Sequence, residues 1–343
     1  MIPRHRIRAA LVATALAATL ALSGCGTSTG NEEAVNDDGS VDLSKVTLIV
    51  GDQRSTSNEA LLKAAGLDDT EYDIQWQEFT SGPPMLEAAN AGAIHTGMVG
   101  NTPPIFAAAA DATFRIVSAT TFTGVGDAIL VPKDSPLQSV ADLAGKKVGF
   151  AEGSSANYNL LAQLDSAGVS YDDIEIQNLQ PADALAAFAS GHLDAWAVWE
   201  PYTSQAEIDE DARVLADGTD LMNGLSFQIA SDAALDDPAT EAALADYLNR
   251  ITRAQLWASE HPDEWSKVWA EQTGLSPEIT LAAVKKRPVS PVAIDQSVID
   301  SEQEMADAFT GAGLLPGSVD VAAYFDDRFN DDTTGDSVES SAR

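Results

Sequence analysis

From Val46 onward, segments whose apolar residues have the spacing of a strand alternate with segments whose apolar residues have the spacing of a helix. Short apolar or alternating runs are typical of strands, and they occur at residues 46–50, 72–79, 94–99, 114–119, 128–131, 147–151, 174–179 and 193–198. The segments between them repeat with the helical period, several ending at a glycine, and predict helices at residues 59–65, 84–91, 104–110, 157–167 and 182–190. This alternation predicts an α/β fold in which helices cover open, mostly parallel sheets.

The pattern changes after Ala230, where helical periodicity replaces the alternation. Four further helices are predicted at residues 238–260, 262–271, 277–286 and 295–312. Three of them begin with a proline, which suits the first turn because its missing N–H has no helical partner there. Residues 330–343 are acidic and rich in serine, so we expect a disordered tail.

Residues 85–99 and 184–198 form an internal repeat. The two segments share their apolar positions, a glycine that ends the helix and the phase of the strand that follows. One explanation is that any two helix–strand units look alike. The other is a chain of two lobes with similar topology, a layout that places a ligand in the cleft between them.

The first 25 residues have the shape of an export signal. Three arginines precede an apolar run at residues 9–22, which as a helix spans only about 21 Å of a hydrocarbon core of roughly 30 Å. The run ends in Leu-Ser-Gly-Cys, which resembles the bacterial lipoprotein box. We therefore expect a signal peptide at residues 1–24, lipid on Cys25 and a flexible tether at residues 25–44; the alternative is a plain secretory signal with an incidental cysteine.

Composition narrows the possible functions. The chain has 343 residues, of which 45% are apolar, and 53 acidic residues against 19 basic ones give a formal charge of −34. Such a surface repels nucleic-acid phosphates and anionic lipid headgroups, which excludes a nonspecific nucleic-acid binder. A single cysteine excludes a disulfide framework and cysteine-based metal clusters, and four scattered histidines offer little for another metal centre. We expect no metal and no cofactor.

Four motifs carry a resemblance to a known family: EFTSGPPMLEA at residues 78–88, GNTPPIF at 100–106, ILVPKDSP at 129–136 and DAWAVWEPY at 194–202. In this order they resemble the aliphatic-sulfonate branch of the ABC-transporter solute-binding proteins, and taurine and nitrate receptors share the broader pattern. The resemblance implies a type II periplasmic-binding-protein fold. It places residues 45–128 and 228–329 in the first lobe and residues 129–227 in the second, with strands near 128–131 and 225–230 as the hinge.

The resemblance also implies a biological setting. The protein would be a monomer, anchored by lipid on the extracytoplasmic face of a membrane. It would capture a small anionic solute, an aliphatic sulfonate or taurine, and deliver it to the permease of an ABC importer. Nitrate, a thiamine precursor or another small solute is the alternative ligand.

A sulfonate is ionised at every physiological pH and presents three weakly basic oxygens, so its site needs donors and no proton transfer. In an acidic protein, a helix N-terminus is an economical source of local positive potential. Three predicted strand-to-helix turns supply one each, and their candidate residues are Gln53, Arg54, Ser55 and Thr56; Asn101 and Thr102; and Gly153, Ser154, Ser155 and Asn157. Thr56 and Glu59 also have the spacing of a capping box. The alternative is that these residues only cap helices.

Several candidates have two interpretations. Arg54 is the one guanidinium in these turns, and it either clamps the anion or pairs with surface carboxylates. Trp196 and Trp199 are three apart in a strand and so point to opposite faces, and we assign Trp199 to the cleft wall. Glu200, which follows, is expected to bind backbone N–H groups or the ammonium of an aminosulfonate. Phe122 and Phe227 are weaker candidates for the wall and fit the core better.

An enzyme is the third functional class that we considered, because the implied fold also hosts a desulfinase with a cysteine nucleophile. Here the sole cysteine is Cys25 in the lipoprotein box, and the sequence contains no Gly-x-Ser-x-Gly motif. We therefore expect a receptor without catalytic residues.

Overall fold

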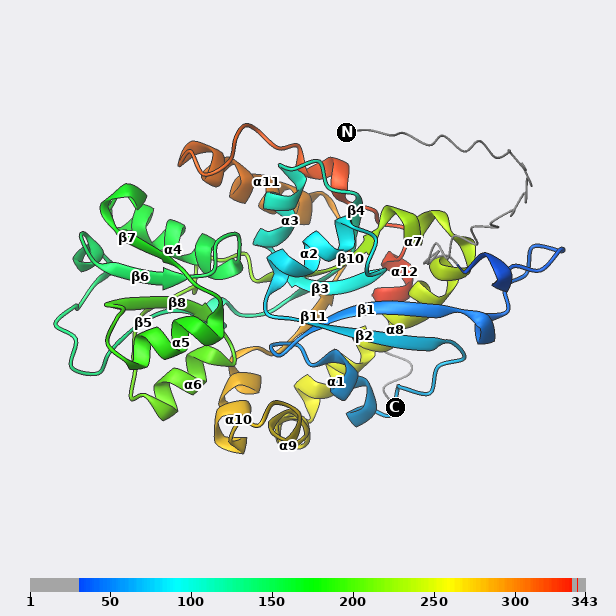
Figure 1. Cartoon of the computed structure of the whole chain (residues 1–343), viewed down its shortest axis with the longest axis horizontal. Helices are drawn as coiled ribbons and strands as arrows, with labels where there is room; N and C mark the ends of the chain where they lie inside the picture. The colour runs from blue at the N-terminus through cyan, green and yellow to red at the C-terminus, as the bar shows by residue number, and fades with distance from the viewer. Residues whose placement is uncertain (1–30, 335–337, 339–343) are drawn as a thin grey trace, which may run out of the picture.

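The computed structural model describes residues 31–334 and 338, and it contains two helix-covered sheets that lie side by side (Figure 1). The first sheet has six strands in the order β11-β4-β10-β3-β1-β2. They are β1 (Thr47–Gln53), β2 (Asp73–Phe79), β3 (Thr96–Gly100), β4 (Phe114–Thr121), β10 (Leu225–Ser231) and β11 (Ser290–Val292). β2, β1 and β3 run parallel, whereas β10 is antiparallel to both of its neighbours.

The second sheet has five strands in the order β7-β6-β8-β5-β9. They are β5 (Asp127–Val131), β6 (Lys147–Phe150), β7 (Glu175–Asn178), β8 (Ala195–Trp199) and β9 (Arg213–Asp217). β6 is parallel to β7 and β8, and β5 is the antiparallel strand. This order repeats the β2-β1-β3-β10-β4 order of the first sheet, which confirms the α/β class and the type II periplasmic-binding fold. We call the part around the first sheet the first lobe and the part around the second sheet the second lobe.

The internal repeat falls on equivalent elements of the two lobes. Residues 85–99 lie in α2 (Gly82–Asn90) and β3, and residues 184–198 lie in α5 (Pro181–Ala189) and β8. The remaining helices of the two units are α1 (Asn58–Ala64), α3 (Thr102–Ala108), α4 (Ser155–Ser166) and α6 (Tyr202–Asp209). In both lobes the helix N-termini follow the carboxyl ends of parallel strands, which is the edge where such sheets bind ligands.

The chain crosses between the lobes twice, at residues 122–126 and 218–224. These segments come directly before β5 and β10, the strands that the resemblance implied as the hinge. In the structure both strands lie inside a sheet, and the segments before them connect the lobes. The two crossings pack directly on one another: a Cβ on Gly124 would lie 2.3 Å from the carbonyl oxygen of Gly218. The Phe122 N–H donates to the Gly224 carbonyl at 2.8 Å, so the crossings are also paired by their backbones.

The C-terminal part forms helices that lie on both sides of the junction between the two lobes in Figure 1. They are α7 (Asp232–Asp236), α8 (Pro238–Glu260), α9 (Pro262–Thr273), α10 (Pro277–Lys286), α11 (Gln296–Gly311) and α12 (Asn330–Thr333). α8, α9 and α10 each have proline in the first turn, as predicted, and Asp237 caps α8 by accepting from two backbone N–H groups. α10 contacts α6 of the second lobe, and α11 contacts both α3 and α4.

The core has separate clusters in the two lobes and one that joins them. Tyr247 and Leu248 of α8 are fully buried with β1, and Trp196 is fully buried in the second lobe. A further cluster brings Leu161 of α4 together with Phe309 of α11 and Ile105 of α3. This contact holds the lobes together on the side of the cleft opposite to α10.

Both ends of the described chain are more ordered than we predicted. Within the expected tether, residues 31–44, the backbone N–H of Asn31 donates to Asp237 at 2.6 Å, and Ala34 is buried. In the expected disordered tail, Asn330 begins α12 and its side chain bonds the backbone of Ile294 in both directions. These contacts join residues far apart in the sequence, so composition does not predict them. The predicted signal peptide at residues 1–24 and the predicted lipid site at Cys25 lie outside the described residues. Within those residues, no helix is long and apolar enough to cross a membrane.

Glu302 of α11 gives the fold a testable dependence on pH. Its side chain is 1% exposed, Asn223 donates to Oε1 at 2.7 Å, and Oε2 has no hydrogen-bond partner. Burial raises the pKa of Glu302 from 4.5 to about 8, although the bond from Asn223 lowers it. Between these two pH values the unfolded chain releases the proton and the folded chain keeps it, so stability falls as pH rises.

We therefore expect Glu302→Gln to raise the melting temperature relative to the unchanged protein at pH 8.5 and to leave it nearly unchanged at pH 4.5. Thermal unfolding across this pH range measures the difference. Glu304→Gln, an exposed position on the same helix, is the control. A Glu302→Gln effect of the same size at both pH values would contradict the assignment.

Candidate functional site

A polar cavity lies in the cleft between the lobes. Its walls come from the carboxyl ends of β1, β3 and β8, the N-terminal ends of α2, α3 and α4, the start of β10, and Phe122 of the first crossing. Its polar lining residues are Gln53, Ser55, Thr56, Ser154, Ser155, Ser226 and Arg287. We call it the head cavity.

Among the described residues, Arg287 is the only charged one that lines the head cavity. It follows the last residue of α10, its guanidinium carbon lies 3.9 Å from the centre of the Phe122 ring, and its stem packs against Gly126. Burial lowers the pKa of Arg287, and the nearby carboxylates of Asp127 and Glu200 oppose that effect. Arg287 therefore supplies a fixed positive charge and a fork of N–H donors at the cleft.

Arg287 is not among the site residues predicted from the sequence, because those came only from the strand-to-helix turns of the repeated units. Arg287 comes from the C-terminal helices, more than 200 residues after the first turn. A signal was present: residues 285–287 are the only run of three consecutive Lys or Arg residues in this acidic chain. Of these three, the structure places only Arg287 in the lining of the head cavity.

The N-terminus of α4 also faces the head cavity. Ser154 is its N-cap residue and Ser155 its first residue, and both line the cavity, as predicted. The Ser154 hydroxyl donates to the Ala151 carbonyl at 2.6 Å, and the Ser155 hydroxyl donates to Oδ1 of Asp127 at 2.7 Å. With both hydroxyl protons committed, the donors left for an anion at the start of this 12-residue helix are the backbone N–H groups of Ser155 and Ala156, because those of Ser154 and Asn157 donate to the carbonyls of Ala151 and Ser154.

Asp127 lies directly behind Ser155. Its carboxyl is 1% exposed, and Oδ2 has no hydrogen-bond partner. Burial raises the pKa of Asp127, whereas the charge of Arg287 and the bond from Ser155 lower it. Ser155 therefore screens the cavity from a buried carboxyl in addition to beginning α4.

Ser155→Ala is expected to weaken binding of an anion in the head cavity by about 1–2 kcal/mol, or roughly 5- to 30-fold, because Asp127 loses its only hydrogen-bond donor. Thr102→Ala is the matched control: Thr102 is fully buried, donates to Asn101 and does not line the cavity. Calorimetric titration of both variants measures the difference. Equal losses in the two variants would show that the effect is general and not local to the site.

In each of the three predicted turns, some candidate residues lie outside the cavity lining. Asn101 and Thr102 do not line it, because the Asn101 amide donates to Asn223 of the second crossing at 2.7 Å. In the α4 turn, Asn157 is fully buried, accepts from Gly153 and donates to Tyr171. These placements correct the assignment of Asn101, Thr102, Gly153 and Asn157, which here tie loops together.

The β1–α1 turn contributes Gln53, Ser55 and Thr56 to the head cavity, whereas Arg54 points elsewhere. The Arg54 guanidinium donates to the Thr273 carbonyl at 3.2 Å and lies 5.6 Å from the centre of the Tyr202 ring. Arg54 thus connects α9 of the first lobe with α6 of the second and does not clamp an anion in the described cavities.

The predicted capping box of Thr56 and Glu59 is wrong. The N-cap residue of α1 is Ser57, in a left-handed conformation with φ 46°. Asp52 takes the capping role, since its carboxylate accepts from Thr56 Oγ1 at 2.7 Å and from the Glu59 N–H at 3.2 Å. Asp52 is seven residues before Glu59, so it lies outside the four-residue spacing by which a capping box is recognised in a sequence.

Trp199 lines the head cavity and Trp196 is buried in the core, as their spacing predicted. Phe122 also lines it, whereas Phe227 is fully buried. Glu200 is buried away from the lining: it accepts from the backbone N–H of Ser204 at 3.2 Å and lies 3.1 Å from Lys286 Nζ. The first of our two expectations for Glu200, binding of backbone N–H groups, describes it.

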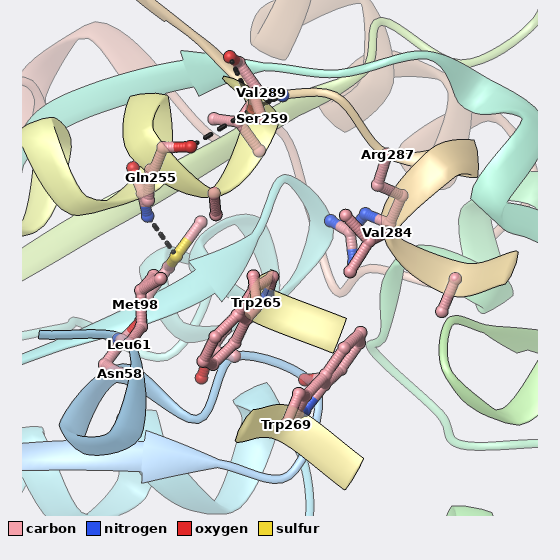
Figure 2. A pocket seen from close by; sticks show the side chains of 14 residues that line it. Asn58, Leu61, Met98, Gln255, Ser259, Trp265, Trp269, Val284, Arg287 and Val289 are labelled. Atoms are coloured by element: carbon pink, nitrogen blue, oxygen red, sulfur yellow. Dashed lines mark hydrogen bonds between the residues drawn. The ribbon is translucent and has the colours of Figure 1, made fainter. Parts of the chain in front are cut away.

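A second cavity adjoins the head cavity (Figure 2). It lies among α1, α8, α9 and α10, and it shares Ser55, Thr56, Met98 and Arg287 with the head cavity. Most of its other lining residues are apolar: Leu61, Ala258, Trp265, Trp269, Ala283, Val284 and Val289. We call it the apolar cavity. Within the described residues, no cluster of three His, Cys, Asp or Glu side chains is placed to hold a metal ion.

Two lobes of matching topology around a polar cleft define a solute-binding protein of the type II periplasmic class. Comparison with known proteins agrees, and the family model "NMT1/THI5 like" matches residues 82–265. The chain therefore belongs to the NMT1/THI5-like family.

Solved structures of relatives resemble the chain over most of its length. The alkanesulfonate-binding protein SsuA of Xanthomonas axonopodis pv. citri, bound to MOPS, is 35% identical with a TM-score of 0.77, and the match covers 81% of this chain and 97% of that one. The periplasmic aliphatic sulphonate binding protein SsuA of Escherichia coli is 36% identical with a TM-score of 0.71, covering 81% and 91%. The desulfurization enzyme DSZB, 18% identical with a TM-score of 0.58 over 84% and 98%, shares the fold alone.

Proposed function

We propose that this protein is the solute-binding receptor of an ABC importer and captures an aliphatic sulfonate on the extracytoplasmic face of a membrane. The observation that carries the proposal is the head cavity, where Arg287, the N-terminus of α4 and several hydroxyl groups converge between the lobes. Relatives of similar length that bind sulfonates support the same assignment.

The chemistry of the head cavity fits a permanently ionised anion with several acceptor oxygens. Its lining contains one cation and no carboxylate, in a chain with a formal charge of −34. A guanidinium fork and free helix N–H groups bind oxyanions without needing a proton transfer. Gln53, Ser55, Thr56 and Ser226 add polar groups around them, and Trp199 and Phe122 supply apolar walls.

The alternative ligands differ in size and charge, and each fits the two cavities less well than an aliphatic sulfonate does. Nitrate would occupy the head cavity alone and leave the adjoining apolar cavity unused. A thiamine precursor is a heteroaromatic base, which gains nothing from Arg287. Taurine carries an ammonium group, and neither cavity has a carboxylate in its lining to receive it.

Calorimetric titration with butanesulfonate, taurine, nitrate, sulfate and an aminopyrimidine precursor of thiamine tests the proposal. We expect butanesulfonate to bind with a dissociation constant in the micromolar range or below, and at least tenfold more tightly than the others. Heat from nitrate or the pyrimidine, with none from butanesulfonate, would replace the proposed ligand.

We also infer that the protein has no catalytic activity of its own. The nucleophile of a desulfinase-like enzyme would be a cysteine thiolate, and the sole cysteine of the chain is Cys25, before the first lobe. A direct assay for sulfite release from the bound sulfonate tests this inference, and sulfite formed in proportion to protein would overturn it.

Lipid anchoring through Cys25 is part of the same proposal, together with action as a monomer that docks on a permease. Because Cys25 follows the apolar run and Gly24 directly, Cys25→Ala should move the protein from the detergent phase to the aqueous phase on detergent partition. A diacylglyceryl group would supply the two chains that stable anchoring needs. Unchanged partition would refute the anchor, and Ser23→Ala serves as the control.

A further inference from the structure

We propose that the first crossing between the lobes positions Arg287 for the ligand. Three of its residues, Phe122, Thr123 and Gly126, hold the side chain and the backbone of Arg287 in place, and we call them the cradle. The inference rests on the proposed function, because it takes Arg287 to bind the sulfonate group. It adds the residues that orient this group and so set the affinity through it.

Arg287 needs support from packing because, within the described part of the chain, its guanidinium donates no hydrogen bond. Its backbone N–H donates to the Val284 carbonyl at 3.2 Å, and Oδ2 of the nearby Asp127 has no hydrogen-bond partner. The N–H groups of the guanidinium are thus available to an anion. A long, flexible side chain loses much conformational entropy when a ligand immobilises it, unless other contacts already hold it.

Phe122 supports the guanidinium. The guanidinium carbon of Arg287 lies 3.9 Å from the centre of the Phe122 ring, which is a close cation–π contact. The Phe122 N–H donates to the Gly224 carbonyl at 2.8 Å, so the ring stands on a fixed backbone. Stacking on a ring leaves the N–H groups at the edge of a guanidinium free to bind a ligand.

Gly126 makes room for the stem of Arg287. A Cβ at Gly126 would lie 2.7 Å from Cγ and 2.9 Å from Cδ of Arg287, closer than such atoms approach in proteins. The backbone of Gly126 is outside the left-handed region, so the missing side chain serves the packing and not the conformation. The Gly126 carbonyl accepts from the Glu200 N–H at 3.1 Å, which fixes this side of the cradle.

Thr123 ties the end of α10 to the same crossing. Its hydroxyl donates to the carbonyl of Lys286, the residue before Arg287, at 2.7 Å. The cradle thus contacts the guanidinium, the stem and the preceding backbone from one five-residue segment. Because this segment connects the lobes, the charge of Arg287 is held at the connection between them.

Gly126→Ala tests the cradle, because its methyl group would displace the stem of Arg287 while the backbone accepts alanine. Calorimetric titration of the whole mature protein with butanesulfonate should show an affinity at least tenfold lower than that of the unchanged protein. Gly311→Ala at the end of α11, where a Cβ would meet nothing within 4 Å, is the matched control and should change the affinity less than twofold. Melting temperatures establish that both variants are folded.

A double-mutant cycle shows whether the loss passes through Arg287. In Arg287→Ala the stem that collides with the new methyl group is absent, so adding Gly126→Ala should weaken butanesulfonate less than twofold further. Titration with a large excess of butanesulfonate measures this weaker binding. A merely structural role of Gly126 would lower the affinity by the same factor in both backgrounds.

Phe122 gives a second test on the other side of the guanidinium. Phe122→Leu keeps an apolar wall and removes the ring, so it should weaken butanesulfonate about fivefold, whereas Phe122→Tyr keeps a ring and should recover most of that affinity. The loss in Phe122→Leu should also disappear in the Arg287→Ala background. This pair carries the test if Gly126→Ala does not fold.

The outcomes separate the cradle from the proposed function. An affinity of Gly126→Ala equal to that of Gly311→Ala, or equal losses from Gly126→Ala with and without Arg287, overturns the cradle and leaves the sulfonate receptor standing. Equal affinities of Phe122→Leu and Phe122→Tyr also overturn it. Failure of the unchanged protein to bind butanesulfonate overturns both.

Discussion

Arg287→Gln is expected to weaken sulfonate binding by about 2–4 kcal/mol, or roughly 30- to 1000-fold in the dissociation constant. Arg287 is the only charged residue in the lining of either cavity. Its loss removes the guanidinium fork and leaves Asp127 without the opposing charge beside it, whereas Glu200 keeps its ion pair with Lys286. Arg287→Lys keeps the charge and loses the planar fork. Its affinity for the sulfonate should therefore lie between that of Arg287→Gln and that of the unchanged protein.

The matched control is Lys286→Gln, one residue earlier. Lys286 carries the same charge and lies 3.1 Å from Glu200, yet it does not line either cavity. Calorimetry of both variants, with melting temperatures recorded in parallel, separates loss of binding from loss of stability. If Arg287→Gln binds the sulfonate as tightly as Lys286→Gln does, the head-group site has been assigned to the wrong residues.

Gly224→Ala should have the largest effect on stability, with a loss of about 3 kcal/mol or more. Gly224 ends the second crossing with φ +68°, and a Cβ there would lie 2.1 Å from the carbonyl oxygen of Phe122 in the first crossing. The left-handed backbone alone costs an alanine about 1–2 kcal/mol. Moving Phe122 also breaks its N–H bond to the Gly224 carbonyl, the bond that pairs the crossings.

Gly66→Ala measures the cost of the left-handed backbone alone, because Gly66 has φ +69° and a Cβ there would meet nothing within 4 Å. Chemical denaturation of the two variants should therefore give a clearly smaller loss for Gly66→Ala, near 1 kcal/mol. Equal losses in both would mean that the crossings can separate freely, and the close packing at the hinge would then carry no stability.

Local periodicity predicted most of the fold, because the strands and helices of the two lobes are each specified by their own residues. The repeat of residues 85–99 at 184–198 even anticipated the matching strand order of the two sheets. Trp196 and Trp199 were separated correctly, since the strand period of two depends on no distant partner.

The site was harder to predict because its residues come from distant parts of the chain. Arg287 reaches the cleft only because α10 packs on α6 of the second lobe, a contact that no local pattern encodes. Asn101 and Arg54 have the residue types expected of an anion site, yet Asn223 and Thr273 already bind their side chains. Which polar side chains stay available to a ligand depends on these tertiary partners, and the sequence does not display them.

A crystal structure of the protein with butanesulfonate tests the central claim most directly. The account predicts sulfonate oxygens within hydrogen-bond distance of the Arg287 guanidinium and of first-turn N–H groups of α4. A sulfonate bound elsewhere on the protein, or in the cleft with no contact to Arg287, would contradict it.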